Sequence, residues 1–136
     1  MSKPIPTIQK YMTTSPHTVG ADQTLAHAHS VLREHKIRHL PVLRGGELVG
    51  MLTERDLALI ETLKDVDPST ILVEDAMSGH VFAVSPEAAL DEVVSEMAAK
   101  KYGSVVVVQN HKVVGILTGV DVCTALADLL HGRLAK

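Results

Sequence analysis

The sequence Gly50-Met51-Leu52-Thr53-Glu54-Arg55-Asp56 decides the fold, because the chain contains a second copy of its pattern. The second copy is Gly115-Ile116-Leu117-Thr118-Gly119-Val120-Asp121, at a constant offset of 65 residues from Thr53 to Thr118. Each copy ends an apolar run with a threonine, places an aspartate three residues later and leads into a helical pattern. The repetition predicts two halves of similar structure within 136 residues.

The motif offers groups that could bind the phosphate and ribose of a nucleotide. Thr53 and Thr118 fall where a predicted strand turns into a predicted helix. Free backbone N–H groups and the positive end of the helix dipole make such a junction favourable for anions. The threonine hydroxyl can donate to a phosphate, and Asp56 or Asp121 can accept from the two hydroxyls of a ribose.

The same spacing is also typical of a helix cap. Threonine at the N-cap position, with an acidic residue three positions later, satisfies the free N–H groups of the helix without any ligand. For one isolated copy we prefer the capping interpretation. Because the whole frame around the motif is duplicated as well, the repeat favours a binding site, and both interpretations stay open at this point.

The frame around each motif predicts a β-α-β-β-α half. The predicted helices that precede the apolar strands end near Lys36 and Lys101, and two-residue hairpins are predicted at Gly45-Gly46 and Asn110-His111. Pro41 cannot donate a ladder hydrogen bond, so its strand is predicted either to lie at an edge or to bond on one side only there.

The predicted fold class is α+β, with two β-α-β-β-α repeats packed sheet to sheet and related by a pseudo-twofold axis. A three-stranded sheet of this size cannot bury both faces alone, which is why we expect the halves to pair. The predicted segments are an N-terminal tail at 1–10, repeat one at 11–63, a surface connection at 64–73, repeat two at 74–131 and a C-terminal tail at 132–136.

Composition restricts the partners. The chain is 46% hydrophobic and carries 13 basic and 16 acidic residues, for a formal charge of −3. This balance gives no electrostatic reason to expect nucleic acid or an anionic membrane as a partner. The single Cys123 excludes an intrachain disulfide and is predicted to be a small buried hydrophobe. No signal-peptide pattern and no membrane-spanning run is found, so we expect a cytoplasmic protein.

Two paired stretches carry a family resemblance. They are Arg38-His39-Leu40-Pro41-Val42 with the first motif, and Gly103-Ser104-Val105-Val106-Val107 with the second. In this arrangement the sequence resembles a tandem pair of CBS domains, the unit called a Bateman module. The resemblance extends from about Tyr11 to Leu130 and includes spacing, turns and motif in both halves.

The resemblance implies a regulatory module that binds adenosine nucleotides or related adenosyl ligands in clefts between the repeats. Thr53 with Asp56 would define one cleft, and Thr118 with Asp121 the other. Strand residues would supply backbone edges and apolar walls for the bases: Leu40, Pro41, Val42, Val105 and Val106, with Val19 and Val84 nearby.

The two motifs differ where a phosphate would lie. The first motif has Glu54-Arg55 where the second has Gly119-Val120, so only the first offers a cation. We expect Arg55 to neutralise phosphate charge and the two clefts to differ in affinity or preferred ligand. The alternative for Arg55 is a solvated residue of the first helical turn.

Eight histidines raise the question of a metal site. His27 and His29 point in nearly opposite directions on a helix, and no CxxC or HExxH pattern is present, so no metal is predicted. His39, just before the apolar strand, is predicted either to lie beside the ligand or to cap the preceding helix; we prefer the first.

The function predicted is a sensor for AMP, ADP, ATP, S-adenosylmethionine or a dinucleotide, acting on an effector protein. No cofactor is expected beyond that ligand, and no enzyme activity, because no P-loop, nucleophile elbow or acid–base pair is found. The alternative is a ligand-free homodimerisation module. A homodimer is expected in either case, because the helices after the motifs carry more apolar side chains than a small core needs.

Overall fold

The computed structural model describes residues 4–134. The chain forms two compact units, which we describe separately. The first unit is Pro16–Val81, and the second combines residues 4–15 with residues 82–134. Each unit contains its own sheet and its own helices, so the predicted α+β class is confirmed. The packing of the repeats sheet to sheet stays a prediction.

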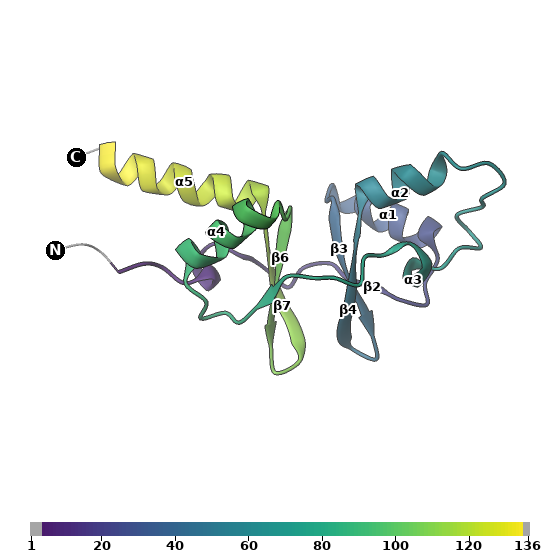
Figure 1. The fold of residues 1–136 in the computed structure, drawn as a ribbon, viewed down its shortest axis with the longest axis horizontal. Helices are drawn as coiled ribbons and strands as arrows, with labels where there is room; N and C mark the ends of the chain where they lie inside the picture. Colours follow the sequence, from purple (N-terminus) through teal and green to yellow (C-terminus); the bar gives the residue numbers. More distant parts are fainter. Residues whose placement is uncertain (1–3, 135–136) are drawn as a thin grey trace. The chain divides into compact units, whose positions relative to one another are not determined.

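The first unit has a three-stranded sheet with helices on one side (Figure 1). Its strands lie in the order β2-β3-β4, with β2 parallel to β3 and β3 antiparallel to β4. In chain order the elements are β2 (Val19–Gly20), α1 (Leu25–His35), β3 (His39–Arg44), β4 (Glu47–Thr53), α2 (Glu54–Glu61) and α3 (Val73–Ala76). The first five follow the predicted β-α-β-β-α order.

The second unit repeats this plan with one more strand. Its sheet order is β1-β7-β6-β5. The elements are η1 (Ile8–Lys10, a 3-10 helix), β1 (Thr13–Thr14), β5 (Ala83–Val84), α4 (Leu90–Lys100), β6 (Ser104–Gln109), β7 (Lys112–Thr118) and α5 (Gly119–Leu134). The part from β5 to α5 again follows the predicted order, so the duplicated sequence frame corresponds to a duplicated fold.

The chain reversals lie where local sequence predicts them. Gly45 and Gly46 have φ angles of 59° and 83°, and Asn110 and His111 have 53° and 65°. Positive φ at both central positions is the geometry of a two-residue hairpin turn that matches the twist of its strands. Glycine adopts it without strain and asparagine nearly so, which explains why the first hairpin is glycine-based and the second begins with asparagine.

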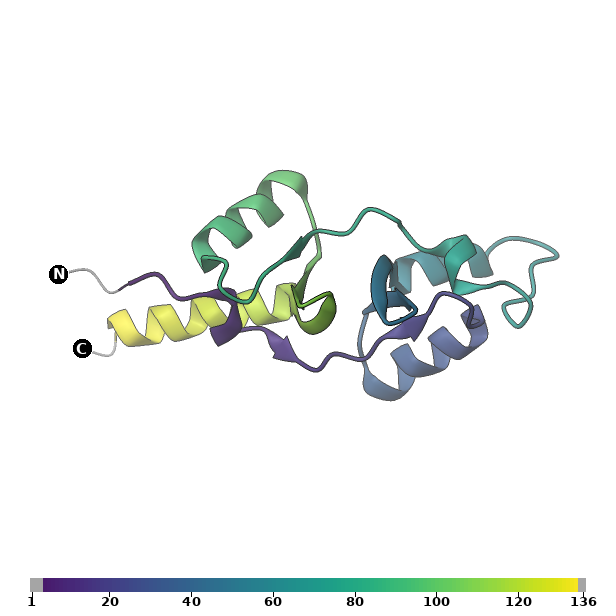
Figure 2. The same ribbon diagram turned by 90° about the horizontal axis from the view of Figure 1, so that it is seen from below.

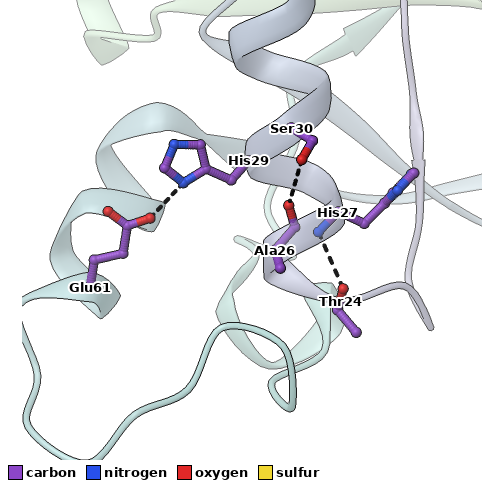
Figure 3. Close-up of polar contacts among 6 residues, drawn as sticks. All are labelled: Thr24, Ala26, His27, His29, Ser30 and Glu61. Carbon is purple, nitrogen blue, oxygen red and sulfur yellow. Dashed lines mark hydrogen bonds and ion pairs between the residues drawn. The ribbon is translucent and has the colours of Figure 1, made fainter.

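The helices α1 and α4 also end as predicted. Lys36 and Lys101 adopt left-handed conformations immediately after the helices, with φ of 54° and 60°. At the other end of α1, the Thr24 hydroxyl accepts from the His27 N–H at 3.2 Å. Figure 3 shows this cap together with His29, which pairs with Glu61 at 2.6 Å. The His29–Glu61 contact joins α1 to α2 on the surface of the first unit.

Pro41 lies in the middle strand of its sheet, so the prediction of an edge strand is wrong. The one-sided alternative agrees with the register. Pro41 is opposite Met51 of β4, whereas β2 pairs only with Val42 and Leu43. The equivalent residue of the second unit, Val106, donates its N–H to the Phe82 carbonyl at 2.9 Å, so Pro41 lacks this bond and β2 pairs with β3 only from Val42 onward.

The N-terminal segment is not the irregular tail that its two prolines suggested. Ile8 lies in η1 and is fully buried in the core of the second unit. Its N–H donates to the Ala88 carbonyl at 2.9 Å, and the Leu90 N–H donates to the Pro6 carbonyl at 2.9 Å. A buried apolar side chain and satisfied backbone groups hold the segment in place. At the other end, α5 continues to Leu134; residues 1–3 and 135–136 of the predicted tails lie outside the described residues.

The segment that leads into each repeat packs into the unit formed mainly by the other repeat. The 3-10 helix η1 precedes the predicted first repeat and β1 lies at its start, but both belong to the second unit, whereas α3, at the start of the predicted second repeat, belongs to the first (Figure 2). Ile8 and Val73 are equivalent at the 65-residue offset, and both are fully buried. Burial of these two apolar side chains explains why neither segment remains a free connection.

Two methionines that are equivalent at the 65-residue offset, Met12 and Met77, pack against glycines of the strands. Met12 lies against Gly115 and Met77 against Gly50, in the centre of the antiparallel strand pairs. A Cβ at position 115 would lie 2.5 Å from the Met12 sulfur, and one at position 50 would lie 2.8 Å from the Ser78 carbonyl oxygen. A side chain at position 50 would collide with backbone, and one at position 115 would require the Met12 side chain to shift.

The helix α5 exposes much of its apolar surface. Leu126, Leu129 and Leu130 are 54%, 53% and 44% exposed, while Val122 and Ala125 pack against the core. Cys123 is exposed, so the prediction that it is a buried hydrophobe is wrong. The reason is its position on the helix, one residue past Val122 and therefore turned away from the sheet. Within residues 4–134, no helix combines the length and apolar character needed to cross a membrane.

Candidate ligand-binding sites at the two Thr-x-x-Asp motifs

The first motif forms a reciprocal helix cap. The Asp56 N–H donates to the Thr53 hydroxyl oxygen at 3.2 Å, and the Thr53 N–H donates to Asp56 Oδ2 at 2.9 Å. This is the capping box that the spacing predicted as one of two interpretations. The contact uses one oxygen of the carboxylate. Within the described part of the chain, Asp56 Oδ1 accepts no hydrogen bond, so one acceptor remains for another partner.

The second motif uses its aspartate more fully. The Thr118 N–H donates to Asp121 Oδ2 at 2.9 Å, and the Thr118 hydroxyl donates to the same oxygen at 3.2 Å. The Thr13 hydroxyl donates to Asp121 Oδ1 at 3.1 Å. Both carboxylate oxygens of Asp121 therefore have donors in this structure, whereas only one of Asp56 has.

Sequence reasoning missed Thr13. Strand β1 brings it to the motif by pairing antiparallel with β7, with Thr13 opposite Ile116. The available signal was a hydroxyl at the matching position of the other repeat, because Ser78 lies 65 residues after Thr13. Ser78 behaves differently, since its hydroxyl bonds within its own turn, to the His80 carbonyl at 3.4 Å. The repeats are thus alike in backbone but not in the partners of their aspartates.

A pocket of about 300 Å³ opens beside the first motif. It is lined by Arg38, His39, Thr53, Glu54, Arg55 and Ala58. The structure thus brings together three predicted site residues, Thr53, Arg55 and His39. It adds two that were not predicted, Arg38 and Glu54. The signal for Arg38 was its place next to His39 in the stretch that carries the family resemblance.

The charges of this pocket are only loosely paired. Arg38 Nε lies 3.8 Å from Glu54 Oε2, and the two side chains are 81% and 65% exposed. Exposed ion pairs of this kind contribute little to stability. Across residues 4–134, Arg55 makes no ion pair within 4 Å. Two guanidinium groups at the pocket are therefore available to an anion.

His39 lies at the start of β3, opposite Thr53 in the sheet. It does not cap α1, because Lys36 occupies the C-cap position, so that alternative is wrong. Burial of the imidazole lowers its pKa below the ordinary value of 6.5, and the positive charge of Arg38 lowers the pKa further. The carboxylate of Asp56 acts in the opposite direction and raises the pKa. His39 is thus electrostatically coupled to the aspartate of the motif.

Most strand residues predicted to wall the bases lie in the cores. Leu40, Val42 and Val19 belong to the core of the first unit. Val105 belongs to the core of the second, and Val84 packs against it. Pro41 and Val106 occupy matching positions in β3 and β6. The core side chains are committed to packing, so contact of a base with the backbone edges of these strands stays a prediction.

One pair of histidines forms a ring contact in the first unit. The rings of His17 and His35 stack with centroids 3.6 Å apart. Across residues 4–134, no group of three or more His, Cys, Asp or Glu side chains is positioned to hold a metal ion.

Comparison with known proteins assigns the family. The CBS domain profile matches residues 8–60 and 73–128. The chain therefore belongs to the CBS domain family and carries two copies of the domain. The CBS domain-containing protein YhcV of Bacillus subtilis (strain 168) is 32% identical over 129 residues, which cover 95% of this chain and 86% of that protein.

Solved structures support the same assignment. The crystal structure of a putative acetoin utilization protein (AcuB) from Vibrio cholerae has a TM-score of 0.86 and 28% identity, and the match covers 98% of both chains. The CBS domain pair of protein MJ0100 has a TM-score of 0.82 and 26% identity, and the match covers 92% of this chain and 98% of that one. That structure is a complex with 5′-methylthioadenosine and S-adenosyl-L-methionine.

We expect His39 to titrate below 6.5 in an NMR pH titration of the folded chain, because burial and Arg38 disfavour its charged form. Asp56→Asn lowers this pKa further, and Arg38→Ala raises it. Since the unfolded chain binds the proton more tightly, His39 lowers the free energy of unfolding as the pH falls from about 7 through its folded pKa. His39→Gln removes this part of the pH dependence. A wild-type pKa at or above 6.5 contradicts the assignment.

Proposed function

We propose that this chain is a regulatory module that binds an adenosine-containing ligand at its Thr-x-x-Asp motifs and transmits occupancy to another protein. The observation that carries the proposal is the geometry of the first motif. There a cap that is complete without ligand leaves Asp56 Oδ1 without a donor, and Thr53, the capping partner of Asp56, lines a pocket together with Arg55 and His39. The relative MJ0100, crystallised with two adenosyl ligands, supports the same ligand class.

The chemistry of the motif suits a nucleoside. A ribose offers two adjacent hydroxyl donors, and a carboxylate with a free oxygen is the matching acceptor. Asp56 is fixed in position because its other oxygen accepts from the Thr53 N–H. The ligand therefore meets a preorganised acceptor and orders few new side chains on binding. AMP, ADP, ATP and S-adenosylmethionine all share this ribose.

The regulatory part of the proposal follows from the absence of catalytic machinery in the sequence. No P-loop, nucleophile elbow or acid–base carboxylate pair is found, so the ligand is bound without being converted. A ligand regulates by binding two arrangements of a protein with different affinity. We propose an effector protein in the cytoplasm as the recipient of this signal.

We also propose that a second copy of the chain covers α5. Leu126, Leu129 and Leu130 are spaced as one stripe on the helix and are 44–54% exposed. Between Gly119 and Leu130 the helix carries only two charges, Asp121 and Asp128, so two copies meet through apolar surface with little electrostatic conflict. An isologous helix pair of this kind is the common form of a homodimer. Ligand-free dimerisation remains the second candidate function if binding is absent.

A thermal-shift screen of the full chain with AMP, ADP, ATP and S-adenosylmethionine tests ligand binding. A ligand at 100 times its dissociation constant stabilises the fold by about 2.7 kcal/mol, which raises the melting midpoint by several degrees, roughly, in a domain of this size. We expect the shift to weaken in Asp56→Ala or Asp121→Ala and to persist in Asp128→Ala, which removes an aspartate outside the motifs. No shift with any ligand contradicts the proposal, as does recovery of a chemically altered nucleotide.

Sedimentation velocity tests the dimer. We expect the wild-type chain to sediment as a dimer and Leu126→Glu/Leu129→Glu to sediment as a monomer, because two charges replace the centre of the apolar stripe. Asp91→Lys on α4 provides a charge-changing control outside the stripe. A dimer that persists in the double variant shows that α5 is not the contact.

A further inference from the structure

The two motifs share a backbone frame but differ in charge. We propose that the first motif selects a phosphate-bearing adenosine ligand, whereas the second takes an adenosyl ligand that carries no phosphate. This inference rests on the function proposed above and specifies the ligand class of each site.

The first unit provides two guanidinium groups where a phosphate would lie, those of Arg38 and Arg55. Arg38, His39 and Arg55 line one pocket with Thr53, whose motif partner Asp56 is the acceptor proposed for the ribose. A guanidinium can donate two parallel hydrogen bonds to a phosphate, which makes arginine well suited to this role. The pocket volume of about 300 Å³ accommodates a phosphate group with part of a sugar.

Glu54 is the opposing charge in this pocket. Its carboxylate lies 3.8 Å from Arg38 Nε, a long contact between two exposed side chains. Because such pairs are worth little in water, an incoming phosphate can replace Glu54 as the partner of Arg38 at small cost. Arg55 needs no such exchange, since it makes no ion pair within 4 Å across the described residues.

The second unit has none of these three side chains at the equivalent positions. At the 65-residue offset Arg38 corresponds to Gly103, His39 to Ser104 and Arg55 to Val120. Glu54 corresponds to Gly119, so the opposing acid is absent too. The charge that remains in the second motif is the carboxylate of Asp121.

A phosphate beside Asp121 would meet a like charge without a compensating cation at these positions, which is unfavourable. A neutral nucleoside or a sulfonium cation avoids that repulsion. Asp121 also differs in its partners, because Thr13 donates to the oxygen that the first motif leaves free on Asp56. A ribose that binds Asp121 shares Oδ1 with the Thr13 hydroxyl, whereas Oδ1 of Asp56 has no other donor.

Isothermal titration of the full chain with AMP, adenosine and S-adenosylmethionine tests this division. The double variant Arg38→Gly/Arg55→Val gives the first unit the residues that the second unit has at the equivalent positions, Gly103 and Val120. We expect the double variant to lose roughly tenfold to a hundredfold in AMP affinity, as expected for charge-assisted hydrogen bonds, and to change adenosine affinity less than twofold. Arg33→Ala removes one positive charge outside this pocket and should leave both affinities unchanged.

Alanine variants of the two motif aspartates assign each ligand to one motif. Asp56→Ala should remove the tight AMP site and preserve a site for S-adenosylmethionine, and Asp121→Ala should do the reverse. Equal losses of AMP and adenosine in the arginine double variant, or unchanged AMP affinity, would overturn the division while leaving the proposed function intact. If none of the three ligands binds the wild-type chain, the proposed function itself fails, and the division with it.

Discussion

The hydrogen bond from the backbone N–H of each motif threonine to the aspartate three residues later is the contact on which both halves depend. At 2.9 Å in each unit, it marks the point where strand β4 or β7 stops and the following helix begins. It also fixes the direction of the carboxylate. The same contact therefore completes the local fold and presents an acceptor, which is why a helix cap and a ligand site need not be competing interpretations of one motif.

A glycine within β4 and another within β7 impose a second constraint. Gly50 and Gly115 allow methionines from a distant segment to lie directly on the strands, and a Cβ at either position would collide with that segment. In the second unit the crossing segment continues as β1 and brings Thr13 to Asp121. The packing of Met12 on Gly115 and the hydrogen bond from Thr13 to Asp121 thus both result from the position of this one segment.

The sequence was sufficient to predict the features that depend on residues close together in the chain. The hairpins at Gly45-Gly46 and Asn110-His111, the helix ends at Lys36 and Lys101 and the cap at Thr53 depend on a few neighbouring residues, and each lies where it was predicted. The order of strands and helices followed from the duplication.

The features that were missed depend on residues far apart in the chain. Burial of Ile8 requires the core of the second half, and the contact of Thr13 with Asp121 spans 108 positions. Arg38 and Arg55 lie on different elements and become one cationic surface only after β3 and β4 pair. The exposure of Cys123 depends on which face of α5 meets the sheet, and the apolar composition of that helix does not reveal this.

A titration of the ¹⁵N-labelled full chain with AMP, followed through its assigned backbone amide signals, tests the central claim most directly. The account predicts that the signals of Thr53 and Asp56 move first, with those of Arg38 and His39, because the Asp56 carboxylate gains a ribose and the pocket gains a phosphate. The signals of Thr118 and Asp121 should respond only at higher concentration. If all four motif signals stay unchanged while AMP binds elsewhere, the motifs are helix caps alone.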